Sequence, residues 1–427
     1  MNHRTRLVLL LVITALLGSG ACSARRATVT VLASWTGDEE VRFRAVLDAF
    51  EHRTGIHYDY AGSRAVDQVL ASQVQQGNPP DIAVLPNPGS AAAYVRSRKL
   101  TPLDGVLSPE VRAGYGPAWT VLQRIGTDSQ YAVAVKTDLK SMIWYAPKKM
   151  AEPFPQTRQQ LLDLSARLTA AGRTPWCLGM GAPPASGWPG TDWIEDILLH
   201  ASGPDFYRRW SGGKVAWTTP EVRDAWQTWG TLVTGQGAVR GGSRAALLTD
   251  FGDAGEGLFT DPPGCLLEHQ ASFALSRYRA ERSSTRSVAG QDFDYFPFPP
   301  RGVSEVSADL AVMFDDTPES RALIDFLAGD EAQLIQAGTG DNVFSPRRSL
   351  ADQHTDVVSR GIARTLTAES LCFDASDLMP APMTEAFYRA VLEFLDDPAR
   401  LDALLHELDG IRLAIPADQW LDIPCGQ

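Results

Sequence analysis

The feature that most constrains the fold is an alternation of strands and helices over residues 27–85. ATVTVLASW (27–35) predicts a strand, a helix then runs to Gly55, and a second strand follows at 56–61. A second helix and the breaker GNPP lead to a third strand at 81–85. The residues expected to face inward from the two helices are Phe43, Val46, Leu47 and Phe50, then Val66, Val69, Leu70 and Val74. This order predicts a parallel sheet with right-handed crossovers, and an α/β fold.

Polar segments follow the first and third strands. In open parallel sheets, ligands bind beyond the carboxyl ends of the strands. The residues at those positions are Trp35 to Glu39 and Pro86 to Gly89, which are rich in turn formers and in side chains that can contact a ligand. We therefore expect a binding rim there.

A second lobe is expected because 427 residues exceed what one hydrophobic core supports. Residues 131–136 and 141–145 resemble a strand pair, and a helix from Gln156 leads to a strand at 174–178. Further on, 293–302 reads as extended, 309–314 as a strand followed by a helix from Thr317, and the C-terminal third as mostly helical.

The N-terminus has the pattern of an export signal over residues 1–21. Arginines precede an apolar run from Leu7 to Leu17, and small residues lead to Cys22. That run is shorter than the roughly 20 residues that span a bilayer, although a transmembrane anchor stays an alternative. The small residues before Cys22 resemble a lipobox, with Ser19 in place of the usual leucine. We predict that Cys22 begins the mature chain and carries lipid.

The other cysteines form an even set of four, at Cys177, Cys265, Cys372 and Cys425. An exported chain meets an oxidising compartment, so two disulfides are expected, with three connectivities open. Four buried thiols are the alternative. The spacing of these cysteines does not match a metal-ligand pattern such as Cys-x-x-Cys.

Charge and missing motifs exclude several classes of protein. Removing residues 1–21 takes away two arginines and no acid, so the formal charge falls from −12 to −14 and argues against a nucleic-acid partner. Such a charge keeps a protein soluble, and we expect a monomer. There is no Gly-x-Ser-x-Gly, His-Glu-x-x-His or Walker loop, and the glycines of GDAGEG (252–257) lack the lysine of a phosphate loop. We expect no cofactor and no metal, and no catalysis.

The segment GWPGTDWIED (187–196) has the composition of a sugar site. An indole packs on the CH-rich face of a pyranose, and carboxylates accept hydrogen bonds from its hydroxyls. We expect the Pro-Gly turn to lift Trp188 clear of a helix that starts near Thr191 or Asp192, with Glu195 completing a capping box. Trp188 is predicted to stack on the sugar, Asp192 to accept from it, and Trp193 to pack in the core.

Several motifs together resemble the extracellular solute-binding proteins, family 1, which serve carbohydrate ABC importers, and most closely the alpha-glucoside-type members. They are WTGDE, FEHRTGIHYDY, GNPPDIAVLPNPGSAAAYVRSRKLTPLD, KSMIWYAP, TPWCLGM, GWPGTDWIED, PPGCLLEHQASF and SDLMP, and the likeness runs from about Ala27 to near the C-terminus. The resemblance implies a two-lobed periplasmic-binding-protein-like fold of type II, with ligand in the inter-lobe cleft. We expect lobe one at 27–134 plus about 305–345, and lobe two at 135–304 plus about 346–427.

Sugar contacts are carried over by position. The resemblance implies Trp35, Glu39, Asn87 and Tyr145, then Trp188, Asp192 and Glu268 from the second lobe. Family members often carry Gly-Gly-Asp where this chain has Ser307-Ala308-Asp309, so Asp309 keeps the carboxylate on a stiffer loop. Arg347 and Arg348 either donate to hydroxyls or form a solvated pair.

The expected function is that of a lipid-anchored receptor on the outer face of the cell membrane. It would capture a mono- or oligosaccharide, most simply an alpha-glucoside such as maltose, trehalose or sucrose, and deliver it to the permease subunits of an ABC importer. An exported glycoside hydrolase and a carbohydrate sensor with the same fold are the alternatives. We further predict that Cys177 pairs with Cys265 beside the sugar segment, and that Cys372 pairs with Cys425 to tie the tail to the preceding helices.

Overall fold

The computed structural model describes residues 27–279, 287–338, 343–368 and 370–426. The predicted signal (1–21) and the lipidation site Cys22 lie outside the described residues. Among the helices in the described ranges, none has both the length and the apolar composition needed to cross a membrane.

The larger of two sheets has six strands in the order β2-β1-β3-β8-β4, with β9 paired to the other end of β8. Its strands are β1 (Thr28–Ala33), β2 (His57–Gly62), β3 (Ile82–Leu85), β4 (Ala132–Leu139), β8 (Val303–Met313) and β9 (Ser370–Phe373). β1 pairs in parallel with β2 and with β3, whereas β8 runs antiparallel to β3 and to β4. The parallel sheet expected from residues 27–85 is therefore confirmed.

The helices between these strands follow the sequence pattern. Helix α2 (Asp38–Thr54) buries the four expected residues and ends at Gly55, whose φ of 74° lies in the left-handed region that glycine adopts without strain. Helix α3 (Val66–Gln75) fully buries Val66 and Leu70. Amphipathic spacing was sufficient to predict these two helices because each helix packs on one face of one sheet.

The smaller sheet has three strands in the order β6-β5-β7, with β5 (Met142–Tyr145), β6 (Leu267–His269) and β7 (Asp294–Pro297). The predicted pairing of 131–136 with 141–145 is wrong. β4 pairs with β8 in the larger sheet, and β5 pairs with β6 and β7 in the smaller one. The chain passes from one sheet to the other at Lys140 and Ser141, so the two strands follow each other instead of folding back.

The two hydrophobic cores largely follow the two sheets, but β5 contributes to both, with Met142 and Trp144 in the first core and Ile143 and Tyr145 in the second. The first core takes side chains from β1, β3, β4 and β8 and from helices α2, α3, α4 (Pro88–Arg96), α5 (Pro109–Ala113), α6 (Pro117–Leu122), α12 (Leu275–Tyr278), α13 (Pro318–Ala328), α14 (Asp330–Ala337) and α15 (Val357–Ala368). The second core takes them from β5 and from helices α7 (Arg158–Ala170), α8 (Trp188–Ser202), α9 (Pro204–Ser211), α10 (Pro220–Val233), α11 (Ser243–Leu248), α17 (Ala381–Asp396) and α18 (Leu401–Ala414). We call the larger sheet with its helices lobe one, and the smaller sheet with the helices of the second core lobe two.

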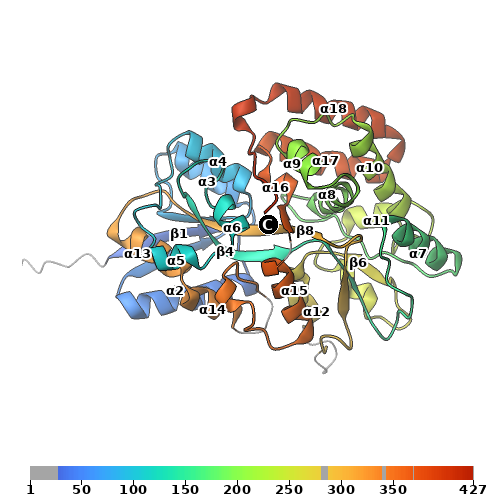
Figure 1. Cartoon of the computed structure of the whole chain (residues 1–427), viewed down its shortest axis with the longest axis horizontal. Coiled ribbons are helices and arrows are strands. Elements are labelled where there is room, and N and C mark those ends of the chain that lie inside the picture. The colour runs from blue at the N-terminus through green and yellow to red at the C-terminus, as the bar shows by residue number, and fades with distance from the viewer. Residues whose placement is uncertain (1–26, 280–286, 339–342, 369, 427) are drawn as a thin grey trace, which may run out of the picture.

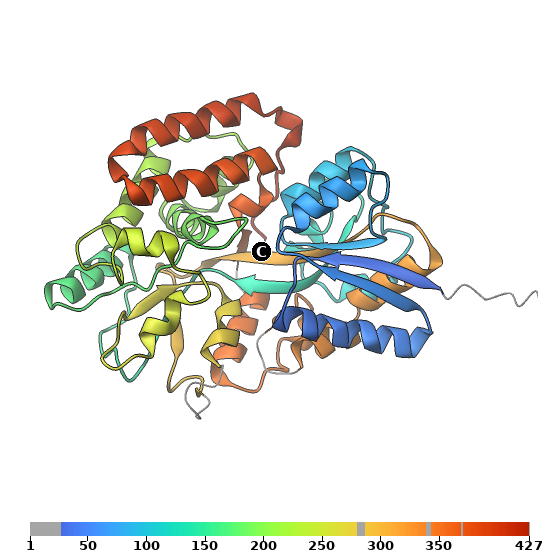
Figure 2. The same cartoon turned by 180° about the vertical axis from the view of Figure 1, so that it is seen from behind.

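The two lobes meet along β4 and β8, which run through the middle of the molecule in both views (Figures 1 and 2). The short helix α16 (Ala375–Leu378) also belongs to both, because Ala375 packs in the second core and Leu378 in the first. Both lobes thus contribute side chains to one central region.

Both predicted disulfides are present, between Cys177 and Cys265 and between Cys372 and Cys425. The strand expected at 174–178 is wrong: Trp176 makes isolated parallel bridges to Val239 and Leu267, so this segment pairs with β6 at a single position without forming a strand. Cys372 lies on β9, so the second disulfide ties the tail to a strand of the larger sheet and not to helices.

Candidate ligand-binding site

A row of charged side chains lies on one face of β4. Because side chains two residues apart share a face of a strand, Lys136, Asp138 and Lys140 at its end point the same way. The antiparallel partner β8 sets Asp309 opposite Lys136, and the chain after β4 continues with Lys140 donating its backbone N–H to the carbonyl of Glu305 at 2.8 Å. The two crossing strands therefore present ionic groups side by side between the lobes.

The Lys136 cluster is the lobe-one half of this site. Lys136 Nζ lies 3.1 Å from Glu39 Oε1, 3.3 Å from Asp138 Oδ2 and 3.5 Å from Asp309 Oδ2. Trp35 donates its indole N–H to Asp309 Oδ2 at 3.3 Å. Three residues predicted from the sequence, Trp35, Glu39 and Asp309, thus meet around a lysine.

Charge in the Lys136 cluster shifts the titration of its members. Burial would raise the pKa of Glu39, but the charges of Lys136 and Arg64 outweigh burial and lower that pKa to about 2. Burial raises the pKa of Asp309 to about 6 against the opposing charge of Lys136. Glu39 is therefore the firm anion of the cluster, and Asp309 is the carboxyl group that can exchange a proton near neutral pH.

Helix α8 belongs to lobe two and contains residues 188–196 of the segment GWPGTDWIED. It starts earlier than predicted. It begins at Trp188, with Gly187 at its N-cap and Pro189 in its first turn, so the predicted capping box at Asp192 and Glu195 is wrong. Gly187 has a φ of 107°, and a Cβ there would collide with the backbone of Tyr388. A turn that only glycine can form starts the helix, and it places Trp188 on the first turn instead of clear of it.

Trp188 and Trp193 lie in different surroundings. Trp193 is fully buried, with its ring edge-to-face on Trp176 at 4.7 Å between centroids, as expected for core packing. Trp188 is half-buried and contacts Phe251 and Phe273 edge-to-face at 5.0 and 5.9 Å. The ammonium of Lys140 lies 5.6 Å from the centre of the Trp188 ring. Trp188 therefore faces the end of the charged row.

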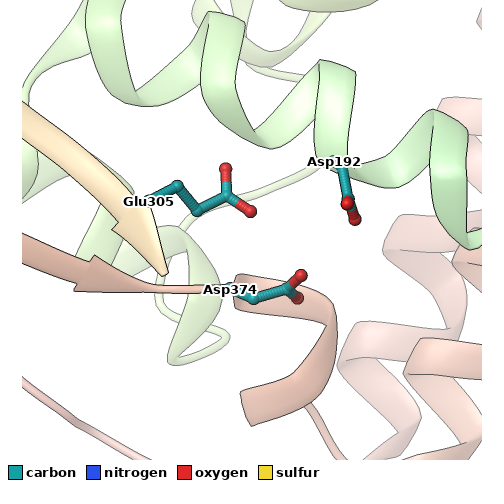
Figure 3. Close-up of side chains that lie close together, drawn as sticks. All are labelled: Asp192, Glu305 and Asp374. Carbon is teal, nitrogen blue, oxygen red and sulfur yellow. The ribbon is translucent and has the colours of Figure 1, made fainter. Parts of the chain in front are cut away.

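The Lys140 cluster is the part of the site next to lobe two, from which α8 contributes Asp192. Lys140 Nζ lies 3.1 Å from Asp192 Oδ1 and also pairs with Asp374. Glu305 points at the same place from β8, as Figure 3 shows, and both of its carboxyl oxygens are buried without a hydrogen-bond partner among the described residues. The three carboxyl groups lie within 4.8 Å of one another.

Burial governs titration in the Lys140 cluster. It raises the pKa of Asp192 to about 7, although Lys140 opposes the shift. Burial, followed by the charge of Glu195, raises the pKa of Glu305 well above its usual value. For Asp374, by contrast, Lys140 outweighs burial and lowers the pKa.

This arrangement of acids also has the dimensions of a metal site. Oxygens up to 4.8 Å apart fit a calcium ion, which binds oxygen at 2.3–2.6 Å. The Lys140 ammonium already lies against two of these three carboxylates. A second cation would meet that ammonium at close range, so the geometry makes Lys140 the counter-ion of the cluster.

The two clusters lie side by side along β4 where the lobes meet. Asp377 on α16 interacts electrostatically with Lys140 and Asp192 on one side and with Asp309 on the other. Helix α4 packs against α16, since a Cβ at Gly89 would meet the backbone of Leu378. Asn87 lies half-buried at the N-cap of α4, beside this contact.

Two of the eight sugar contacts implied by the resemblance lie apart from the others. Tyr145 ends β5, about 16 Å along the strand from Lys140, and packs on Phe154 in the second core. Glu268 is buried in β6 and accepts a hydrogen bond from Tyr278. We leave both out of the proposed site.

The arginine pair also has structural partners. Arg347 is buried, pairs with Asp330 and donates to the Ala328 carbonyl at 2.7 Å. Arg348 donates to the Ala113 carbonyl at 2.9 Å. Both side chains hold their loop against lobe one.

Sequence reasoning did not identify Lys136, Asp138, Lys140, Glu305 and Asp374 as site residues. A signal for the first three was present, because AVAVKTDLKSMIWY carries charges inside an otherwise apolar strand pattern. Charged residues are almost never fully buried unless they are paired. That rule would have predicted acidic partners for both lysines near β4. It does not identify which acids those partners are.

Comparison with known proteins agrees with this architecture. Residues 36–253 match the family model described as bacterial extracellular solute-binding protein. The osmoprotective compounds-binding protein GgtB of Synechocystis sp. is 33% identical over 406 residues, covering 92% of this chain and 94% of that protein. The alpha-glucosides-binding periplasmic protein AglE of Rhizobium meliloti is 32% identical over 397 residues, covering 88% of this chain and 85% of that protein.

Among solved structures, a chitin oligosaccharide binding protein superposes with a TM-score of 0.77 at 18% identity, over 92% of this chain and 99% of that one. At that identity the likeness establishes the two-lobed α/β fold alone. Together with the family model and the two relatives, it shows that this chain belongs to the bacterial extracellular solute-binding proteins of sugar ABC transporters.

Proposed function

We propose that this protein captures a small alpha-glucoside between its two lobes and delivers it to the permease of an ABC importer. The observation that carries the proposal is the meeting of three distant segments along β4. Trp35 and Glu39, Trp188 and Asp192, and Asp309 all border the same row of charges. By the definition of the lobes given above, α15 and β9 belong to lobe one, whereas the limits expected from the sequence assign them to lobe two.

The side chains at this site suit a pyranose. Phe251 and Phe273 fix the orientation of the Trp188 ring, which remains partly accessible for stacking on a sugar face. Glu39 and Asp309 accept hydrogen bonds from hydroxyl groups, and Lys136 donates to them. Closure of the lobes would bring these groups onto opposite sides of one sugar.

The choice of ligand rests on the relatives. One is named for alpha-glucosides and the other for osmoprotective compounds. Maltose, trehalose and sucrose are therefore the first candidates, with cellobiose and chitobiose as comparisons of linkage and substituent.

Calorimetry with these five sugars tests the proposal. We expect one alpha-glucoside site per chain, and Trp188→Ala should weaken it about tenfold or more, because roughly 1.4 kcal/mol of stacking corresponds to one decade. Trp420, also half-buried but packed on Gly213, supplies the matched control Trp420→Ala, which should bind like the wild type. Absence of binding to every sugar would refute the proposal.

The proposal includes the absence of turnover. Lys140 pairs with two of the three clustered carboxylates, and Glu305 is buried beneath them, so they are not free to act on a glycosidic bond. Incubation of each bound sugar with the protein should return it unchanged by chromatography. Release of monosaccharides would favour the hydrolase alternative.

Anchoring through Cys22 completes the proposal. Small residues before Cys22 support cleavage there, and more than one acyl chain is needed for firm membrane attachment. Intact-mass analysis of protein extracted from membranes should show acylated Cys22. Secreted protein with an unmodified Cys22 would refute this part while leaving sugar binding untouched.

A further inference from the structure

The Lys136 and Lys140 clusters together contain many more acids than bases. The carboxyl groups are Glu39, Asp138, Asp192, Glu305, Asp309, Asp374 and Asp377, and the cations in contact with them are Lys136, Lys140 and Arg64. Even without Glu305 and Asp377, whose pKa values burial raises well above their usual range, five carboxyl groups remain against three cations. The electrostatic potential between the lobes is therefore negative.

Each cation in these clusters is already engaged by a carboxylate. Lys136 is shared by three acids within 3.5 Å, and Lys140 by two. Arg64 Nη2 lies 2.8 Å from Glu39 Oε2. A negatively charged ligand would therefore have to compete with carboxylates for every one of these cations.

Hydroxyl groups fit such a site better than anions do. An ionised carboxylate only accepts hydrogen bonds, so it needs donors from the ligand, and a neutral sugar supplies several. Hydrogen bonds to a charged acceptor are about twice as strong as those between neutral groups. A ligand carboxylate or phosphate offers no donor there and meets like charge in partly desolvated surroundings, which opposes binding.

We propose that the site selects uncharged, hydroxyl-rich sugars and rejects sugar acids and sugar phosphates. This selectivity rests on the proposed function and extends it from a sugar class to a charge class. The same potential accepts a ligand in which an ammonium group replaces one hydroxyl, because an ammonium group is also a donor.

Three forms of one disaccharide test the selectivity. Calorimetry at pH 7.5 and low salt would compare the best-binding neutral alpha-glucoside with its C6-oxidised uronate and its 6-amino-6-deoxy form. We expect the uronate to bind at least 100-fold more weakly than the neutral sugar, and the amine to bind at least as tightly. In 1 M salt the Debye length shrinks to about 3 Å, so the difference in affinity between the neutral sugar and the uronate should become smaller.

A variant at the site sharpens the test. Glu39→Gln removes one charge and keeps the shape, so the ratio of neutral to uronate affinity should fall several-fold, whatever happens to either affinity alone. Glu221→Gln, on the exposed start of α10, is the matched control and should leave that ratio unchanged. Uronate binding within threefold of the neutral sugar would overturn the charge selectivity and leave the proposed function standing. Failure of all three forms to bind would overturn both.

Discussion

The two lysine clusters share their chemistry but differ in access to solvent. In the Lys136 cluster the Glu39 side chain is 29% exposed and Asp309 is 12% exposed. In the Lys140 cluster Asp192 is 3% exposed and Asp374 is 1% exposed. The Lys136 cluster can therefore exchange partners with a ligand, whereas the Lys140 cluster is closed to solvent.

This difference separates two roles for buried ion pairs. A closed pair is strongly destabilising to break, because the remaining charge has no water to receive it, whereas an accessible one can be replaced by ligand hydroxyls. In the proposed function, the Lys140 cluster then fixes the passage from β4 to β5 and sets the position of Trp188, while the Lys136 cluster would contact the sugar. The predictions below test this division, from the largest expected effect to the smallest.

Lys140→Met should give the largest loss of stability. It leaves Asp192 and Asp374 buried without their shared cation, at a cost of about 3–5 kcal/mol in the free energy of unfolding. Urea denaturation measures the loss. Lys136→Met is the matched control and should cost less, because Glu39 retains Arg64 and some solvent. Equal losses in the two variants would remove the distinction between the clusters.

Trp193→Ala should show the reverse of Trp188→Ala. Trp193 is fully buried against Trp176 and His269, so its truncation leaves a cavity worth about 3–5 kcal/mol of stability. Melting temperature and sugar affinity, measured on both variants, separate the roles. A well-folded Trp193→Ala that alone loses affinity would mean that the two tryptophans are assigned the wrong way round.

The buried pair behind the Lys140 cluster should give a pH-dependent stability. His200 Nδ1 lies 2.8 Å from the Asp196 carbonyl oxygen and Nε2 lies 3.2 Å from that of Val303, so both ring nitrogens face acceptors, which favours the imidazolium form. Burial disfavours the charged forms of both Asp196 and His200. Even so, the two imidazoles, His200 and His269, lower the pKa of Asp196 to about 2, and Asp196 raises the pKa of His200.

The sign of the pH dependence of stability follows from the directions of these two pKa shifts. The contribution of Asp196 is present above its unfolded pKa near 4 and is lost as pH falls toward 2, whereas that of His200 is present below about pH 6.5 and is lost as pH rises through its higher folded pKa. The stability gap between wild type and Asp196→Asn should therefore be widest between about pH 4 and 6.5 and narrow by about 2 kcal/mol toward acid. Urea denaturation across this range measures it. A gap that stays constant with pH would contradict the ion pair.

Glu39→Gln should have the smallest effect on stability. Its side chain is partly exposed, so the loss of its ion pairs should cost about 1 kcal/mol or less. Affinity for the neutral sugar should fall more than stability does, because a charge-assisted acceptor becomes an amide. Denaturation and calorimetry on the same variant give both numbers. A stability loss as large as that of Lys140→Met would show that the Lys136 cluster is structural as well.

Much of lobe one could be predicted because its signals are local. The inward spacing in α2 and the glycine after it define a helix without any partner, and the alternation over 27–85 defines the parallel sheet. The residues at the strand ends, Trp35 and Glu39, followed from the same topology. Asp309 required the resemblance, since 270 residues separate it from Glu39 in the chain.

The rest depended on long-range pairing. Nothing between 131 and 145 shows that Lys140 is a passage between two sheets, so two successive strands looked like a hairpin. The start of α8 depended on the close approach of Gly187 to Tyr388, two hundred residues away. Asp374 and Glu305 become site residues only once β8 and β9 bring them to Lys140, and no sequence spacing records that.

Hydrogen–deuterium exchange with and without saturating sugar tests most directly whether one ligand contacts both lobes. We expect slower exchange, in the same experiment, over residues 35–39 and 136–140 and over 188–192 and 374–377, with Trp188→Ala losing the lobe-two protection first. A hollow of about 380 Å³ between α7 and α10, lined by Leu162, Thr231 and their neighbours, is the control region and should not change. Protection confined to one lobe, or centred on that hollow, would contradict a sugar site between the lobes.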